Sequence, residues 1–313
     1  MALTLALFEK IGALSVLIIL GFLAVRFKVM DFEDSKILSR WALYFLTPCA
    51  MLDAFQYEFT MSKLTGMGIS LLGSLITVVV FALLSKVLTK VFHLSPVDYT
   101  SLEYPNAGNF MLPLIASAMG GDWVIYCSPC FLVMNILMFS HGKAVLSGER
   151  GFHADMLFKN VVVLATLAGF VMFLLHFQIP GFLGTAVSSL GNMMGPAYMF
   201  TIGMIIGNAD LKKVFFNGRA WLLCAGRLVI YPLAVMLVLC VCGIFRIHSE
   251  AAHILLIVVL TAGAPAAVMV TQFTQLYRTR EEAEFASVVN ILSTVLCLLT
   301  MPCIAYLYQL LAF

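Results

Sequence analysis

Apolar residues fill most of this chain in long runs, which turn-forming or charged clusters interrupt at intervals. A helix needs about 20 mostly apolar residues to cross the hydrocarbon core of a bilayer. By that measure the sequence predicts ten membrane-spanning helices. They cover residues 5–25, 37–57, 65–89, 99–119, 123–143, 157–177, 186–207, 219–245, 252–274 and 285–310.

The composition supports the same fold class, an all-α polytopic membrane protein. Hydrophobic residues make up 62% of the chain and charged residues only 11%, whereas a soluble domain carries about 25% charged residues. So few charges cannot cover a water-facing surface, and we therefore expect the lipid bilayer to surround most of the molecule. The net charge of +2 indicates no nucleic-acid partner and no strongly acidic one.

Lysine and arginine set the orientation of a polytopic protein, because they are enriched in its cytoplasmic loops. Most of the 18 Lys and Arg residues lie in the odd-numbered loops between the predicted helices, whereas the even-numbered loops hold only Lys63 and Arg246. The sequence therefore predicts a multi-pass protein of the cell membrane, plasma or inner, with both termini on the non-cytoplasmic side.

The two halves of the chain share landmarks. Gly21-Phe22 and Gly169-Phe170 fall at matching points of the first and sixth predicted helices, and Pro48 and Pro196 match in the second and seventh. Because each half has an odd number of helices, the second half must enter the membrane from the opposite side. This plan of two inverted five-helix repeats is common in secondary transporters. The two predicted repeats are residues 1–147 and 148–313.

The fourth and ninth predicted helices contain helix-breaking residues near the middle of the membrane. The fourth includes Pro105, Gly108 and Pro113, and the ninth includes Gly263-Ala264-Pro265. Proline removes a backbone donor and clashes with the preceding turn, so we expect breaks between about Asn106 and Leu112 and near Gly263-Ala264. Backbone groups freed at a break cannot face lipid, so both breaks must face protein or a wet cavity.

Paired breaks predict a site for an anion. Each half-helix that restarts after a break directs its N-terminal N–H groups and its positive dipole end toward the midplane. Asn106 and Asn109 add amide donors and acceptors at the same level. Two proline kinks packed against neighbouring helices are the alternative, but interruptions at corresponding positions of both halves favour a binding site.

These features together resemble those of the auxin efflux carrier family, whose members include plant auxin exporters and bacterial malonate-type permeases. The resemblance covers essentially the whole length. It rests on the stretch from Asn106 to Pro113 with Gly120-Gly121, the stretch from Arg227 to Pro232, Gly263-Ala264-Pro265, and a closing helix with Ala286, Ser293 and Pro302.

The resemblance implies that helices four and nine cross as broken helices at the substrate site. It implies a scaffold of helices one, two, six and seven, against which the other helices move in an elevator-like way, and an organic anion, usually a carboxylate, as the substrate. The short central loop, roughly Ala144 to Asp155, matches the short bacterial type. Asn109-Phe110-Met111 replaces the further small residues of many members, which leaves the substrate open.

Polar residues inside other predicted helices are further candidates for this site. Arg227 could be a counter-charge for the substrate or the partner of a carboxylate inside the protein. The alternative is a side chain that snorkels to the membrane interface. Glu103 is the candidate for a proton or a coupling ion, and a place in the vestibule is its alternative. Asn135 and Asn290 either face the crossing or form hydrogen bonds between helices. The substrate-binding candidates are Asn106, Asn109, Pro113, Gly263, Ala264, Pro265, Arg227, Asn135 and Asn290.

One face of the seventh predicted helix carries four glycines whose spacings are four or eight residues. Residues this small allow helix backbones to approach closely. The face therefore predicts either packing within the chain or the seam of a homodimer. Its members are Gly191, Gly195, Gly203 and Gly207.

The chain contains no H-E-x-x-H, Walker A or G-x-S-x-G motif, so we expect neither an enzyme nor a bound metal or cofactor. The sequence predicts a secondary transporter that moves a small organic anion by elevator-type alternating access. A bile-acid-type symporter coupled to sodium or protons is one alternative. A transporter-like ligand sensor without flux is the other.

Overall fold

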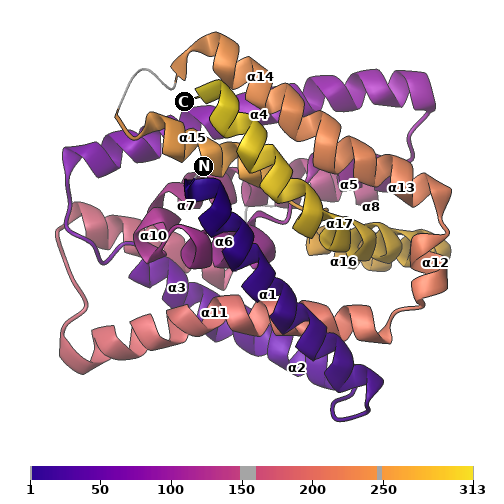
Figure 1. Ribbon diagram of the computed structural model, residues 1–313, viewed down its shortest axis with the longest axis horizontal. Helices are drawn as coiled ribbons and strands as arrows, with labels where there is room; N and C mark the ends of the chain where they lie inside the picture. The colour runs from indigo at the N-terminus through magenta and orange to yellow at the C-terminus, as the bar shows by residue number, and fades with distance from the viewer. Residues whose placement is uncertain (1, 149–159, 245–248, 313) are drawn as a thin grey trace.

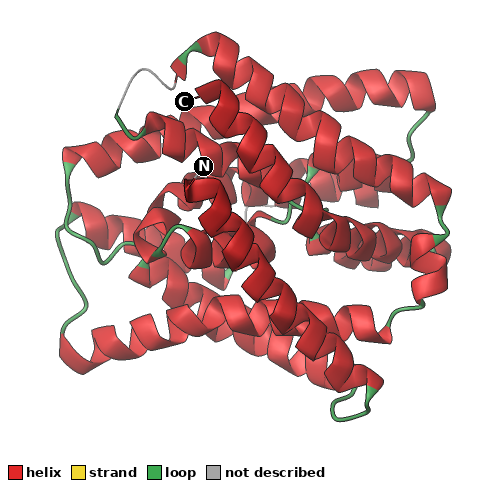
Figure 2. Ribbon diagram, in the orientation of Figure 1, coloured by secondary structure: helices red, strands yellow, loops and turns green. Residues whose placement is uncertain are grey.

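The computed structural model describes residues 2–148, 160–244 and 249–312, and its regular elements there are all helices (Figures 1 and 2). Each of the ten predicted segments is helical. Four helical stretches are long and apolar enough to cross a membrane, and shorter apolar helices accompany them. The predicted start of the sixth segment at residue 157 and the end of the eighth at 245 lie outside the described residues.

The helices of the two predicted halves follow one another with short connections. In the first half they are α1 (Ala2–Arg26), α2 (Phe32–Trp41), η1 (Ala42–Leu46), α3 (Thr47–Asp53), α4 (Met61–Phe92), α5 (Pro96–Glu103), η2 (Ala107–Met111), α6 (Leu112–Ala118), η3 (Gly121–Trp123), α7 (Val124–Leu137), η4 (Met138–Gly142) and α8 (Lys143–Ser147). In the second half they are α10 (Val161–Leu174), α11 (Gly181–Asn208), α12 (Leu211–Phe215), α13 (Gly218–Ala225), η5 (Gly226–Ile230), α14 (Tyr231–Cys242), α15 (Ala251–Ala262), α16 (Val268–Tyr277) and α17 (Arg280–Ala312).

Proline explains where several of these helices lose their regular geometry. The π-helical stretches η1, η2 and η5 each end two residues before a proline, which is Pro48, Pro113 or Pro232. Proline has no N–H for the carbonyl four residues earlier, so the helix widens locally to accommodate it. Pro196 and Pro302, by contrast, lie inside continuous helices.

The closest packing of two helices is that of α1 against α11, which cross in Figure 1. A Cβ atom on Gly203 would lie 2.0 Å from the Ile18 carbonyl oxygen, and one on Gly21 would lie 2.0 Å from that of Phe200. The two backbones are therefore in direct contact, and no side chain larger than hydrogen fits between them. The glycine face of α11 lies against elements of its own chain, so its interpretation as a homodimer seam is wrong.

The helices pack in two groups. In the first, α11 packs against α1 and α3, and α3 packs against α10. In the second, α4 packs against α7, α14 and α15, and α17 packs against α13 and α16. The half-helices α5 and α16 contact members of the second group, and α6 also packs against α1 and α11. The elements of the broken helices therefore lie where the two groups meet.

The glycine contact between α1 and α11 generates a stability prediction. Gly203→Ala is expected to lower the free energy of unfolding by about 1–3 kcal/mol, because overpacking forces the two backbones apart. The measurement is the apparent melting temperature of the detergent-purified protein. Gly68→Ala on α4 is the matched control, because its Cβ would meet nothing within 4 Å. Equal melting temperatures for the two variants would contradict the direct backbone contact.

Candidate functional site

Two broken helices cross and exchange backbone hydrogen bonds at the centre of the molecule. The Asn106 amide donates to the Pro265 carbonyl oxygen at 2.8 Å, and the Ala267 amide donates to the Tyr104 carbonyl oxygen at 2.9 Å. Pro105 and Ala266 lie opposite each other in this short antiparallel bridge. Both predicted breaks are therefore present, and each provides the partners for the backbone groups that the other exposes.

The first break lies slightly earlier than the sequence predicted. α5 ends at Glu103 and the helix resumes at Ala107, so the extended residues surround Pro105 rather than the region from Asn106 to Leu112. Pro113 lies at the start of α6, directly after the π-helical stretch η2, whose wider turn accommodates the missing N–H. The Asn106 side-chain oxygen accepts from the Asn109 amide at 3.2 Å and thereby caps the restarted helix.

The last helix, α17, holds the second break in place. The side-chain amide of Asn290 donates to the Ala266 carbonyl oxygen at 2.6 Å, and the Ser293 hydroxyl accepts from the Ala266 amide at 3.1 Å. Both backbone groups of Ala266 are thus bonded to side chains. Asn290 acts through this interhelical hydrogen bond, which was the alternative left open for it.

A cavity of about 380 Å³ adjoins the crossing, and the restarted helices supply part of its wall. Ala107, Gly108 and Asn109 belong to the first turn after one break, and Val268 and Met269 belong to the first turn after the other. The N-terminal, electropositive ends of both half-helices therefore border the same space.

The rest of the wall is formed by side-chain amides and by apolar and aromatic groups, and it includes residues of η1, α3 and α10 from the first helix group. No charged side chain lines the cavity within the described part of the chain. The cavity therefore lies between the two helix groups. Its amide-bearing residues are Asn106, Asn109, Asn135, Asn160 and Gln272, and its aromatic residues are Tyr44, Tyr104, Phe131, Phe139 and Phe273.

Only some of the predicted binding residues reach this cavity. Asn106, Asn109 and Asn135 line it, although the Asn135 amide also donates to the Phe131 carbonyl oxygen of its own helix at 2.8 Å. The other candidates lie outside its wall, because they are buried in the crossing or packed against neighbouring helices. Those candidates are Pro113, Gly263, Ala264, Pro265, Arg227, Asn290 and Glu103.

Arg227 joins the two broken helices and does not line the cavity. Its Nε donates to the Ala264 carbonyl oxygen and its Nη1 to the Leu102 carbonyl oxygen, each at 3.1 Å. Its guanidinium also lies over the Phe81 ring, 5.1 Å from the centroid. The side chain is 1% exposed, so the alternative of snorkelling to the interface is wrong.

The crossing therefore has two electrostatically different sides. The half-helices α5 and α15 end beside Arg227, and their C-terminal ends are electronegative and favour a cation. The half-helices that begin after the breaks direct their electropositive ends to the cavity. Arg227 thus offsets the electronegative helix ends on one side of the crossing, while electropositive helix ends border the cavity.

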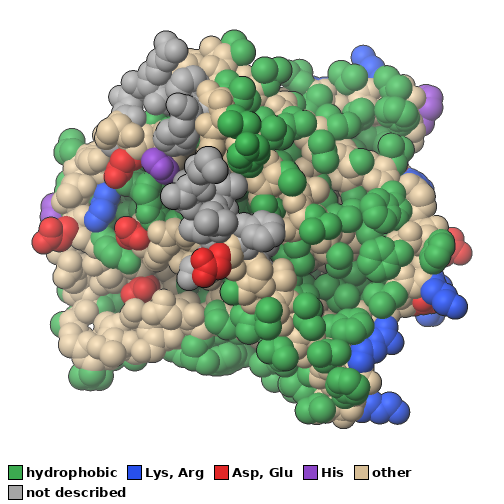
Figure 3. Space-filling view, viewed as in Figure 1, with side chains coloured by type: hydrophobic (Ala, Val, Ile, Leu, Met, Phe, Trp, Pro, Cys, Tyr) green, Lys and Arg blue, Asp and Glu red, His purple; other side chains and the backbone are tan. Residues whose placement is uncertain are grey.

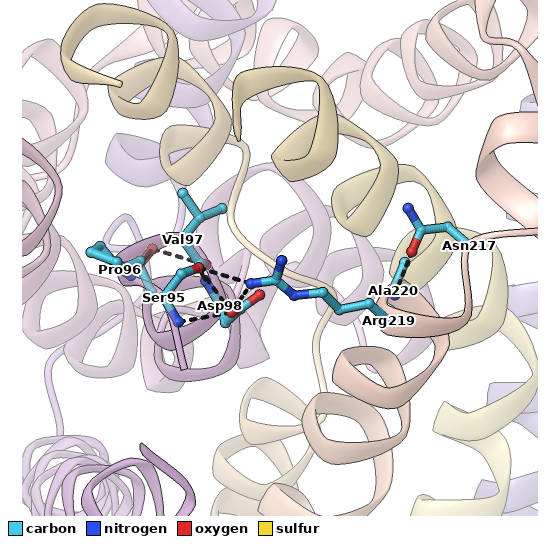
Figure 4. A network of polar contacts seen from close by, with 8 residues as sticks. Ser95, Pro96, Val97, Asp98, Asn217, Arg219 and Ala220 are labelled. Carbon is cyan, nitrogen blue, oxygen red and sulfur yellow. Dashed lines mark hydrogen bonds and ion pairs between the residues drawn. The ribbon is translucent and has the colours of Figure 1, made fainter. Parts of the chain in front are cut away.

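Polar contacts also fix the far end of α5. Arg219 of α13 forms an ion pair with Asp98 and donates to the Ser95 hydroxyl at 3.1 Å (Figure 4). Ser95 and Asp98 cap each other at the start of α5. The half-helix is therefore held at its beginning by Arg219 and at its end by Arg227, and both arginines come from the predicted eighth spanning segment.

Sequence reasoning missed several residues of the cavity wall. Asn160 caps α10 by accepting from the amides of Val162 and Val163, and an asparagine directly before a long apolar run is the usual signal of such a cap. Gln272 lies one turn after Val268 in the restarted half-helix. Tyr44 and Thr47 gave no signal of their own, because only the packing of η1 and α3 brings them to the cavity.

Removing the Arg227 guanidinium is expected to destabilise the protein. Arg227→Met leaves two buried carbonyl oxygens without their donors, each at a cost of about 1–3 kcal/mol. Arg227→Lys keeps the charge but cannot donate in two fixed directions, so an intermediate loss is expected. Melting temperatures in detergent measure the effect, with Arg280→Met as the control, because Arg280 is 92% exposed. An Arg227→Met protein as stable as the control would contradict the linking role.

Comparison with known families gives the context for this site. A family model described as a membrane transport protein matches residues 6–151 and 152–305, which together are nearly the whole chain. A comparison with curated proteins returned no match. Members of the matched family are transporters, which agrees with the expectation of a non-enzyme, and the apolar helices agree with a multi-pass membrane protein. The chain belongs to the auxin efflux carrier family of membrane transport proteins.

Proposed function

We propose that this protein is a secondary transporter of a small organic anion, of the carboxylate class, which binds in the cavity beside the crossing. The observation that supports this most strongly is the convergence of two helix N-termini on one cavity. Backbone N–H groups and the dipole at a helix N-terminus favour a carboxylate or phosphate. Two such ends reinforce each other.

The remaining wall favours a small carboxylate with some apolar character. The cavity volume of about 380 Å³ lies at the lower end of the usual range for ligand sites, roughly 300–1,000 Å³. Side-chain amides supply directional hydrogen bonds, and the aromatic side chains supply apolar contacts. The absence of a charged side chain from the described wall leaves the helix ends as the main source of positive potential.

Alternating access follows from the place of the cavity between two helix groups. One wall comes from η1 and α3, which pack against α11, and from α10, which packs against α3, and the other wall comes from α7, η4 and the broken helices. A movement of the second group along the first would carry the anion site across the membrane. We therefore propose that α1, α2, α3, α10 and α11 form the scaffold and that the elevator consists of the other helices.

The distribution of charge supports the proposed orientation. In Figure 3, Lys and Arg side chains gather at the right edge of the visible face and most of the visible acidic side chains lie at the left, with apolar side chains between them. α4 and α11 run from left to right in this orientation (Figure 1). We propose that the edge rich in lysine and arginine is cytoplasmic, as the loop charges predict.

Substitution of Asn106 tests the anion site. Asn106→Asp keeps the cap on the Asn109 amide, because aspartate caps helices as well as asparagine does. It also places a negative charge in the cavity wall, and like charges about 4 Å apart repel by roughly 4 kcal/mol at an effective dielectric constant of about 20. Uptake of radiolabelled malonate and lactate into proteoliposomes is expected to fall by at least about tenfold.

Asn106→Ala is expected to abolish this uptake as well, with a loss of stability of about 1 kcal/mol from the missing cap. Asn192→Ala on the exposed face of α11 is the matched control and should transport normally. Uptake by the Asn106→Asp protein at the wild-type rate would show that the anion binds elsewhere. Binding of these anions in thermal-shift experiments without any flux would identify a ligand sensor instead.

A reporter fused to the C-terminus tests the orientation. Because both termini are expected on the non-cytoplasmic side, alkaline phosphatase fused after Phe313 should be active when the protein is expressed in bacteria. Green fluorescent protein at the same point should remain dark after export. The opposite pattern would indicate an odd number of spanning helices or an inverted orientation.

A further inference from the structure

A buried carboxylate and a buried guanidinium lie close together behind the crossing, and each has a polar atom without a partner. Glu103 is 7% exposed and Arg227 is 1% exposed. Within the described part of the chain, Oε2 of Glu103 and Nη2 of Arg227 have no hydrogen-bond partner. Buried polar atoms are paired in the large majority of cases, so two unpaired atoms on neighbouring groups of opposite charge need an explanation.

The position of Glu103 is electrostatically unfavourable for a carboxylate. It is the last residue of α5, and the C-terminal end of a helix repels negative charge. The guanidinium of Arg227 donates to the Leu102 and Ala264 carbonyl oxygens and not to Glu103. A carboxylate that is buried without a bonded cation carries a desolvation cost that no ion pair offsets.

The ionisable groups around Glu103 come from four places in the fold. Its charge acts on Tyr99 of the same half-helix, Tyr104 after it, Arg227 of η5 and Tyr231 of α14. Other charged residues on the helices that pack against α5 are engaged elsewhere or exposed. They are Arg219 (paired with Asp98), Lys143 (over the Tyr277 ring), Arg280 (paired with Glu284), Glu282 (bonded to Thr279), Lys63 (bonded to the Glu58 carbonyl oxygen) and the exposed Glu281, Lys86 and Lys90.

Polar side chains connect this buried carboxylate with the surface. Tyr99 lies one helical turn before Glu103 and packs edge-on against His141, with ring centroids 5.7 Å apart. The Tyr104 hydroxyl lies 2.7 Å from Nδ1 of the same histidine. His141 is exposed in η4, near the end of the predicted fifth spanning helix. Tyr99, Tyr104 and His141 therefore form a cluster of hydroxyl and imidazole groups beside Glu103.

We propose that Glu103 binds and releases one proton in each transport cycle, so that the protein moves its anion together with a proton. The proposal rests on the proposed function and adds the coupling ion to it. When Glu103 is ionised, its charge cancels that of Arg227, and a bound anion must cross the membrane uncompensated. When Glu103 is protonated, Arg227 offsets one negative charge of the anion.

The two binding events therefore favour each other. A charge inside the membrane is costly, so the protonated state binds the anion better, and by linkage the bound anion raises the affinity for the proton by the same factor. The proton enters from the aqueous phase on one side and leaves to the aqueous phase on the other.

The test compares wild type with Glu103→Gln, which permanently mimics the protonated side chain, in proteoliposomes that contain a pH-sensitive dye. Radiolabelled lactate and malonate are the probes, and the exposed Glu58→Gln is the matched control. A gradient of one pH unit is expected to drive up to about tenfold accumulation of lactate by wild type above protein-free liposomes, with acidification of the lumen. Glu58→Gln should behave as wild type does.

Glu103→Gln is expected to lose the accumulation and the proton movement while it still exchanges internal unlabelled anion for external labelled anion. That exchange also shows that the variant is folded. Glu103→Asp keeps a titratable carboxyl group and should retain coupling. Wild-type uptake that ignores the pH gradient, or gradient-driven accumulation by Glu103→Gln, would overturn the inference.

If wild type moves neither probe, the proposed function fails for these anions, and the inference is decided without flux. Infrared difference spectra between high and low pH should then show the C=O band of a protonated carboxyl group in wild type and in Glu58→Gln. The band should be missing in Glu103→Gln. A wild-type spectrum without such a band, or the same band in all three proteins, would overturn the inference.

Discussion

Backbone hydrogen bonding inside an apolar medium is the constraint on which this structure depends. A helix satisfies its own N–H and C=O groups, and a break at mid-membrane exposes groups that lipid cannot satisfy. Here the backbone groups exposed at one break form hydrogen bonds with those exposed at the other. The bonds lie in the short antiparallel bridge that joins residues 104–106 to residues 265–267. Arg227 and α17 bind the carbonyl and amide groups that remain. Neither broken helix would be stable at this depth without the other.

The paired breaks also place the positive and negative ends of the half-helix dipoles on different sides of the crossing. Four half-helix ends meet there, and the two N-terminal ends face the cavity while the two C-terminal ends face Arg227. The proposed anion site therefore needs no positively charged side chain in the described wall. Helix ends are rigidly placed and add little desolvation cost compared with a buried lysine or arginine, so such a site suits a transporter that must also release its ligand.

The contact between α1 and α11 and the interface between the two helix groups differ in how closely they are packed. This difference suits the proposed movement of one group against the other. Glycine brings the backbones of α1 and α11 into direct contact, which leaves no room for sliding between them. The interface between the helix groups is different, because the cavity interrupts it and amides and aromatic side chains face each other across the space. The rigid contact lies within one group, and the hollow contact lies between the groups.

The sequence by itself determined the all-helical class of fold and the existence of both breaks, because long apolar runs and prolines within them have few structural solutions. It also singled out Asn106, Asn109 and Asn135, which line the cavity, whereas their role in binding, the ten-helix inverted repeat and the orientation stay predictions. The tertiary structure decided the rest. The pairing of the breaks, the bonds of Arg227 and the contributions of Tyr44, Thr47 and Gln272 depend on which helices cross and at what height. No local pattern encodes those contacts, since they join residues far apart in the sequence: Arg227 is 37 positions from Ala264 and 125 from Leu102.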